Sequence, residues 1–296
     1  MTFTPACVEE EYKKDPKLKK EDVKKLMEWI DMQAHLPKVT ELQVILFLHS
    51  CMYSNEQAKI TIDNYFTVKT LCEDIFGNRN DLSVLDSQEI GLMTVLPKKT
   101  PEGYIVILMK LIDCDPDKFV FAHQIRNFDM NVIRHLNTQG TSEGVVIVVD
   151  MDGMVFGHLT KLNIIVMKKF MFYLQEAMPI RIRGLHYINV VSFMDKVMAL
   201  IKPFMNKELL SMFCLHSDLV EFYKTVPIEC MPKEYGGENE TIQSLKEKER
   251  KSYLENKDFY NFEDSQKVDE KKRAGKPKNA SDFFGVEGTF KKLEVD

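Results

Sequence analysis

The sequence predicts an α/β protein in which a small all-helical domain precedes an α/β domain with a mostly parallel sheet. Apolar runs at Tyr104–Leu111 and Val145–Val149, and a third run at Arg181–Val190, are typical of strands. Segments with helical periodicity separate these runs along the chain. Strands that alternate with helices form βαβ units, and continuously apolar strands are expected to be covered by other elements on both faces.

The segment before the first predicted strand shows helical signals. An amphipathic helix is predicted at Asp22–Asp31, and Thr40 has the chemistry of a helix start before the apolar run that ends at Cys51. Apolar residues recur near the helical period again in Asn55–Asp74. Residues 1–87 are therefore expected to form the helical domain.

The α/β domain is expected at residues 88–237, where the period of apolar residues changes. Its helices are predicted at Asp117–Leu136, Thr160–Ala177 and Phe193–Met205. The last of these is rich in methionine, whose flexible side chain suits a surface that repacks around apolar ligands.

Residues 238–296 form a charged C-terminal tail. We expect a solvated helix at Lys246–Asn256 followed by an extended segment, because both signs of charge alternate there and aliphatic residues are few. The aromatic island at residues 282–295 is expected to pack back onto the body. A protein partner would bind through this tail.

Composition excludes several classes of function. The formal net charge of −5 argues against a nucleic-acid partner. The apolar runs are shorter than the roughly 20 residues of a membrane-spanning helix, and the N-terminus lacks the apolar core of a secretory signal. The scattered cysteines, without a CxxC pair, are interpreted as free thiols of a reducing compartment. No metal site and no cofactor are expected, since metal-ligand spacings and phosphate-binding glycine loops are lacking.

Asp150 and Asp152 follow a buried strand in a pattern that also occurs in Mg²⁺-dependent phosphatases, where the two carboxylates serve as nucleophile and acid/base. That chemistry needs a further lysine and acidic pair, and the later acidic residues here lie in the polar tail. We therefore expect Asp150 and Asp152 to end the strand and cap the following turn. Ser142 in Gly140–Gly144 matches a nucleophile-elbow pattern, but it precedes the strand instead of following it, which predicts a loop.

A set of residues after Val149 forms a specific pattern: Asp150, Gly153, His158, Pro179, Arg183, Gly184, His186, Ile188, Asn189, Lys202, Pro203, Phe204, His216 and Pro232–Gly237. In these positions the chain resembles the CRAL-TRIO family of lipid-binding proteins, in its tocopherol- and retinaldehyde-binding branch, and the tail resembles that of arthropod members. The resemblance implies a non-enzymatic carrier that binds a hydrophobic small molecule, such as a tocopherol, retinoid, carotenoid or phospholipid, and transfers it between membranes. It also implies a cytoplasmic protein with transient peripheral membrane association.

The resemblance further implies an apolar pocket closed by a gating helix within Asn189–Met212. The expected ligand-binding residues are Val145, Ile147, Val149, Phe156, Phe170, Tyr173, Leu174, Ile180, Ile182, Leu185, Val190, Phe193, Val197, Leu200 and Ile201. A polar contact for the ligand head group is expected from Tyr173, Tyr187 or His123.

A basic patch that binds membrane phosphoinositide is predicted at Arg181, Arg183, Lys202 and Lys207. Two further positions that are basic in the family are Glu208 and Met212 here, which weakens the patch. The alternative function is a lipid-sensing adaptor that regulates a protein partner, and the charged tail is the feature that favours it.

Overall fold

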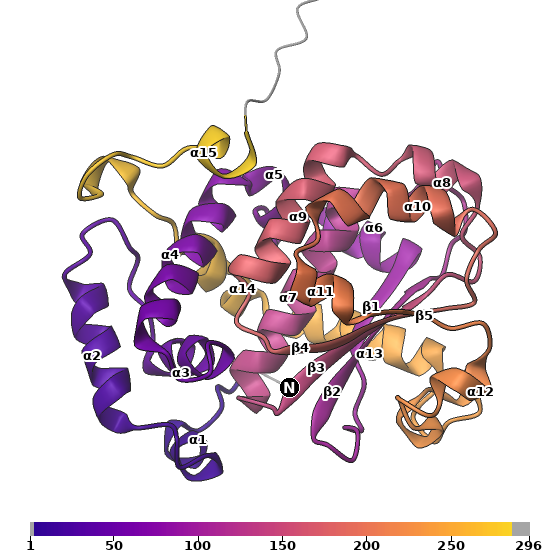
Figure 1. The fold of residues 1–296 in the computed structure, drawn as a ribbon, viewed down its shortest axis with the longest axis horizontal. Helices are drawn as coiled ribbons and strands as arrows, with labels where there is room; N and C mark the ends of the chain where they lie inside the picture. The colour runs from indigo at the N-terminus through magenta and orange to yellow at the C-terminus, as the bar shows by residue number, and fades with distance from the viewer. Residues whose placement is uncertain (1–2, 286–296) are drawn as a thin grey trace, which may run out of the picture.

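The computed structural model describes residues 3–285 of the chain and is drawn in Figure 1. The elements before the first strand are helices, as predicted. Their bounds are α1 (Val8–Lys14), α2 (Lys20–Asp31), α3 (Glu41–Ser50), α4 (Asn55–Leu71), α5 (Glu73–Phe76) and α6 (Leu82–Ile90). The predicted start of α3 is confirmed by a capping box, in which the Thr40 hydroxyl accepts from the Gln43 N–H at 3.2 Å and the Gln43 Oε1 accepts from the Thr40 N–H at 3.0 Å.

Within residues 3–285, five strands form one sheet in the order β1-β2-β3-β4-β5. The strands are β1 (Gly91–Val95), β2 (Tyr104–Leu111), β3 (Gly144–Asp150), β4 (Ile182–Ile188) and β5 (Phe213–Leu215). β1 pairs with β2 antiparallel, and the other pairs are parallel. The mostly parallel sheet is thereby confirmed, with its three central strands where the sequence predicts them. The edge strands β1 and β5 are short and were not predicted.

The remaining elements follow in chain order. They are α7 (Phe121–Gln139), α8 (Phe156–Thr160), α9 (Ile164–Glu176), α10 (Met194–Ile201), η1 (Lys202–Phe204), α11 (Lys207–Ser211), α12 (Leu219–Phe222), η2 (Ile228–Cys230), η3 (Lys233–Tyr235), α13 (Ile242–Glu255), α14 (Lys257–Ser265), η4 (Glu270–Lys272) and α15 (Ala280–Phe284). The expected helix Thr160–Ala177 is divided, because the Asn163 side chain accepts from the N–H groups of Ile165 and Val166 and starts α9 there. No helix within residues 3–285 is both long and apolar enough to cross a membrane.

The sheet is covered on both faces, as its apolar strands require. In β3, Val145 and Ile147 belong to the core that also contains residues of α7, α9 and α10, whereas Val146 and Val148 belong to a second core on the opposite face. Figure 1 shows α7, α9 and α10 on one side of the sheet and α12 and α13 on the other. Side chains alternate along a strand, so each central strand contributes to both cores.

The helix expected at Lys246–Asn256 is present as α13, but α13 and α14 bury one face each, so the expectation that this part of the tail is solvated throughout is wrong. Leu245 and Tyr253 of α13 are buried, as are Phe259 and Tyr260 of α14. The expected packing of 282–295 is seen for its first part, where the Phe284 ring lies 5.8 Å from the ring of Phe172. Residues 286–295 of that segment lie outside the described residues.

A buried ionic cluster joins the tail to the rest of the protein. Lys69 on α4 pairs with Glu263 on α14 at 3.1 Å. Arg79, in the loop before α6, pairs with Asp129 on α7 at 2.8 Å and with Asp264 at 2.7 Å. Because charges are costly to bury unless they are paired, these contacts fix the helical segment, the α/β segment and the tail against one another.

Candidate functional site

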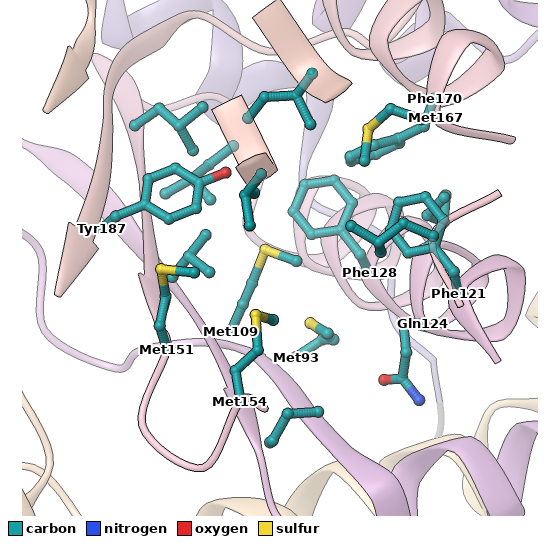
Figure 2. A pocket seen from close by; sticks show the side chains of 18 of the residues that line it. Met93, Met109, Phe121, Gln124, Phe128, Met151, Met154, Met167, Phe170 and Tyr187 are labelled. Atoms are coloured by element: carbon teal, nitrogen blue, oxygen red, sulfur yellow. The ribbon is translucent and has the colours of Figure 1, made fainter. Parts of the chain in front are cut away.

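An apolar cavity of about 140 Å³ lies between the sheet and the helices that cover one face of it (Figure 2). Its walls come from strands β1 to β4, from α7, α9 and α10, and from the loops after β2 and β3. The lining residues are Met93, Met109, Lys110, Leu111, Phe119, Phe121, Gln124, Ile125, Phe128, Ile147, Val149, Asp150, Met151, Met154, Leu162, Met167, Phe170, Met171, Leu174, Leu185, Tyr187, Val197 and Ile201.

The size and composition of the cavity indicate that its walls adapt to a ligand. Pockets for small molecules commonly measure about 300–1,000 Å³, whereas this cavity measures about 140 Å³. A molecule of that size would have to displace side chains in order to enter. Methionines gather around the cavity in Figure 2, among them Met93, Met109, Met151, Met154 and Met167. Their unbranched side chains change rotamer at little cost, which suits this repacking.

The structure brings part of the predicted ligand-binding set to the cavity. The residues that line it are Ile147, Val149, Phe170, Leu174, Leu185, Val197 and Ile201. They come from β3, β4, α9 and α10, so the predicted arrangement of sheet, helix and lid holds as geometry. Their contact with a ligand stays a prediction.

The other predicted residues lie elsewhere. They are Val145, Phe156, Tyr173, Ile180, Ile182, Val190, Phe193 and Leu200. Ile180 and Ile182 face a separate polar cavity. Val145 is buried in the core on the same face of β3 as Ile147, but it stands two residues nearer the start of the strand.

Three residues of the predicted lid segment, Val190, Phe193 and Leu200, also fall outside the cavity, as does Phe156, which contacts one of them. Phe156 is exposed, and its ring contacts that of Phe193 at 5.6 Å. Val190, just after β4, and Leu200 on α10 are half-buried. On a short helix only one face meets the sheet, and in α10 this face carries Val197 and Ile201, which lie four residues apart.

The cavity contains residues that the sequence reasoning did not select, mostly from β1, β2 and α7. Register explains two of them: Met109 is the pairing partner of both Met93 on β1 and Val149 on β3, so all three side chains stand on one face of the sheet. Phe121, Ile125 and Phe128 form the apolar stripe of α7. The apolar stripe is the feature of the sequence from which these three residues could have been predicted to face the sheet.

The polar residues expected to bind a head group separate into three environments. Tyr187 lines the cavity, and burial raises the pKa of its phenol. Tyr173 is wrong as a head-group contact, because its hydroxyl is buried and donates to Asp129. His123 lines an outer groove beside α6, and burial, followed by the charge of Arg126, lowers its pKa.

Asp150 lines the cavity, and both oxygens of its carboxylate accept hydrogen bonds. It accepts from Lys110 Nζ at 2.7 Å, Asn189 Nδ2 at 2.8 Å and the N–H of Asp152 at 2.9 Å, and also from the hydroxyl of Tyr235. These contacts tie the ends of β2, β3 and β4 to η3, which fits the expected strand-ending role. Within residues 3–285, no group of three or more His, Cys, Asp or Glu side chains is arranged to hold a metal ion.

The predicted basic patch is not gathered at one place. Arg181 and Arg183 line a polar cavity of about 430 Å³ between the helical segment and the end of α9. Arg181 is held there, since its Nε donates to the carbonyl oxygen of His49 at 2.7 Å and its guanidinium lies 5.3 Å from the Tyr53 ring. Lys202 and Lys207 are exposed and lie outside this cavity.

The electrostatics of the polar cavity are mixed. Glu176 and Glu208 line it together with the two arginines. Burial, followed by the charge of Glu208, raises the pKa of Glu176. An anionic head group in this cavity would therefore meet carboxylates as well as guanidinium groups.

Exposed apolar side chains gather around α8 and the start of α9. Val155, Phe156, Ile164 and Ile165 are each between 43% and 49% exposed. Lys196 of α10 lies beside them, with its Nζ 5.0 Å from the centre of the Phe156 ring. We call this set of exposed residues the α8 patch. In Figure 1, α8 lies next to α10, which contributes Val197 and Ile201 to the cavity wall.

Comparison with known proteins shows which families and proteins the chain is similar to. A family described as "CRAL/TRIO domain" matches residues 91–237, and one described as "Pinta-like, UBA domain" matches residues 15–84. The chain is similar to the alpha-tocopherol transfer protein-like protein of Homo sapiens, with 27% identity over 196 residues that cover 66% of this chain and 57% of the relative. It is also similar to clavesin-1 of Xenopus laevis, with 22% identity over 198 residues that cover 66% of this chain and 60% of the relative.

These alignments span less than two thirds of the length of either curated relative. Among solved structures, the crystal structure of Sfh5 is similar with a TM-score of 0.38 and 11% identity, over 70% of this chain and 84% of that one.

Proposed function

We propose, on the premise that this chain belongs to the CRAL-TRIO family, that it binds a hydrophobic small molecule in the apolar cavity and carries it between membranes. The observation that carries this proposal is the cavity itself. Its lining is almost entirely apolar, and it is shared between the sheet, α7, α9 and α10. A tocopherol, retinoid, carotenoid or phospholipid fits this chemistry.

The release of such a ligand requires a lid that opens at a membrane. Burial of apolar groups contributes about 0.8 kcal/mol per methylene, so transfer of a chain of about twenty carbons into water costs up to about 16 kcal/mol. We assign the lid to α10, whose Val197 and Ile201 face the cavity. Pro203, directly after α10, stops the helix and gives the lid a defined end.

The α8 patch is the proposed membrane-docking surface. Its exposed apolar side chains adjoin the lid, so their insertion into a lipid interface brings the cavity next to the membrane. We propose cytoplasmic action with transient membrane association. Anionic lipid would add to the attraction through Lys196, which lies beside the patch.

Native mass spectrometry of the protein purified from its natural source, combined with organic extraction, tests this function. A stoichiometric co-purifying lipid is the expected result, and its mass identifies the ligand class. A protein without lipid that also takes up no labelled retinoid, tocopherol or phospholipid contradicts the proposal.

That second outcome favours the alternative function, an adaptor that regulates a protein partner. The observations in favour of an adaptor are the similarity of residues 15–84 to a family named for a UBA domain and the charged surface of the tail. In that case the partner would be a protein, and the α8 patch and the tail are the surfaces to mutate first.

A further inference from the structure

The outward face of α9 is a continuous stripe made by Ile164, Ile165, Lys168 and Phe172. From each isoleucine to Lys168, and from Lys168 to Phe172, the step is three or four residues, which keeps these side chains on one side of the helix. Phe172, at the C-terminal end of the stripe, is covered by the aromatic side chains of α15. Ile164 and Ile165, at the N-terminal end, are exposed and belong to the α8 patch. The stripe is therefore covered at one end only.

The C-terminal tail follows this stripe towards its exposed end. The ring of Phe283 lies 5.3 Å from that of Phe172. One residue later, the carbonyl oxygen of Phe284 accepts from Nζ of Lys168 at 2.6 Å, and Lys168 stands one helical turn nearer the start of α9. A Cβ atom at Gly285 would lie 3.6 Å from the same Nζ, so the backbone is still beside Lys168 at that point. The next turn of α9 in this direction carries the two exposed isoleucines.

Residues 286–296, which lie outside the described residues, have a sequence that can cover those isoleucines. They read VEGTFKKLEVD, with apolar side chains at Val286, Phe290, Leu293 and Val295 among charged ones. One helical turn is about 5.4 Å long, whereas a segment of this length spans up to about 36 Å when extended. A tethered segment acts at an effective concentration of about 1 mM. Even a weak apolar contact is therefore enough to hold it on the patch.

The charge beside the α8 patch is complementary to this segment. Nζ of Lys196 lies over the ring of Phe156, and no carboxylate of residues 3–285 forms an ion pair with it. The segment carries carboxylates at Glu287, Glu294 and Asp296. One of them can pair with Lys196 while the neighbouring apolar side chains cover the isoleucines.

We infer that residues 286–296 bind the α8 patch of their own chain when the protein is free in solution. A lipid interface then competes with these residues for the same apolar side chains. The segment thus keeps the docking surface covered until a membrane displaces it. This competition rests on the proposed function, because that function makes the patch the membrane-docking surface, whereas the contact within the chain does not depend on it.

A photo-crosslinker tests the contact in the absence of lipid. With p-benzoylphenylalanine in place of Phe290, irradiation of the full chain is expected to form a bond to α8 or to the first turn of α9, and peptide mass spectrometry locates it. The same group in place of Lys271, an exposed residue of η4, is the control and should not label the patch. A bond to another part of the chain, a bond to a second copy, or no bond at all overturns the inference.

Sedimentation with liposomes tests the competition. The double variant Phe290→Ser with Leu293→Ser is expected to raise the bound fraction several-fold, because the patch loses its cover. In a protein that also carries Ile164→Ser and Ile165→Ser, the same change is expected to have no effect. An unchanged or smaller fraction in the first variant, or an equal rise in both backgrounds, overturns the competition. Failure of every protein to sediment contradicts the proposed docking surface and the competition with it, whereas crosslinking from position 290 to the patch still supports the contact within the chain.

Discussion

The hydroxyl of Tyr173 on α9 donates a hydrogen bond of 2.5 Å to Oδ1 of Asp129 on α7, and both side chains are completely buried. Burial alone would raise the pKa of Asp129, but the charges of Lys69 and Arg79 and the bond from Tyr173 together lower it. The carboxylate is therefore charged inside the core. Tyr173 belongs to the ionic cluster that holds the protein together and is turned away from the ligand cavity.

Tyr173→Phe is therefore expected to lower the free energy of unfolding without changing ligand affinity. The loss is about 1.5–3 kcal/mol, because a buried hydrogen bond to a charged group disappears. Urea denaturation measures the first effect and a lipid titration the second. Tyr187→Phe, in the cavity wall, is the matched variant and is expected to be close to wild type in stability. An affinity change of more than threefold in Tyr173→Phe would restore Tyr173 as a head-group contact.

Glu263→Gln is expected to destabilise the protein by about 1.5–3 kcal/mol, because it removes the buried charge that accepts from Lys69, whereas Lys69 keeps Asp129 at 3.5 Å as its other partner. Glu263 is buried on α14 and accepts from Lys69 Nζ and from the Tyr65 hydroxyl, each at 3.1 Å. Thermal and urea unfolding measure the loss. Glu247→Gln on the exposed side of α13 is the control and should change stability by less than about 0.5 kcal/mol. Equal, small effects of the two variants would mean that α14 does not contribute to the core.

Val197→Asp is expected to abolish lipid binding and to leave the far-ultraviolet circular dichroism spectrum unchanged. The side chain lies on the cavity face of α10, where a carboxylate would be buried against apolar groups without a partner. Ala199→Asp places the same charge on the exposed side of the same helix and should retain binding. A fluorescent lipid titration of both variants is the measurement. Retained binding by Val197→Asp would mean that α10 does not contact the bound lipid.

The α8 patch is expected to control membrane association separately from ligand affinity. Replacement of Ile164 and Ile165 by serine should reduce sedimentation with liposomes several-fold, since about half of each side chain is available for insertion. Ligand titration should give the wild-type affinity. Val220→Ser is the control, because Val220 is 73% exposed but lies on α12, away from the lid. Equal sedimentation of the wild type, the double serine variant and Val220→Ser would mean that the α8 patch is not the docking surface.

Acid is expected to destabilise the protein through a buried histidine pair. Nδ1 of His186 lies 2.8 Å from Nε2 of His216. Burial, followed by the proximity of His216, lowers the pKa of His186 to about 4, and burial lowers the pKa of His216 as well. In an unfolded chain histidine titrates near pH 6.5. The unfolded state therefore binds more protons between these values. The stability that the neutral pair confers is complete above about pH 6.5 and is lost as the pH falls towards 4.

Urea unfolding at pH 7, 6 and 5 measures this dependence. His186→Gln should show a shallower loss of stability than the wild type over this range. Part of the dependence should remain, because burial also lowers the pKa of His135 to about 4 and that of His49 to about 3. Parallel curves for the two proteins would mean that the pair is not buried neutral.

Several features of the fold follow from local sequence alone. Periodicity located the central strands and the α-helices of ten or more residues within residues 3–285, and Thr40 marked the start of α3, because caps and apolar repeats are properties of neighbouring residues. β1 and β5 were not predicted, since edge strands of five and three residues carry little periodic signal. The packing of the tail was not predicted either. Its charges indicated a solvated segment, and the partners of Glu263 and Asp264 lie in the sequence nearly two hundred residues earlier.

The sequence by itself determined that an apolar strand-helix-strand unit follows a helical segment, and three of the residues predicted for a pocket, Ile147, Leu174 and Val197, lie in the cavity wall. Only the tertiary structure decided which apolar residues face the cavity and which face the other core or solvent. Strand register aligned Met93, Met109 and Val149, and the packing of α7 on β1 brought Gln124 into the cavity wall. The physical reason is that periodicity specifies which face of an element is apolar, whereas the identity of the group opposite that face depends on contacts between segments far apart in the chain.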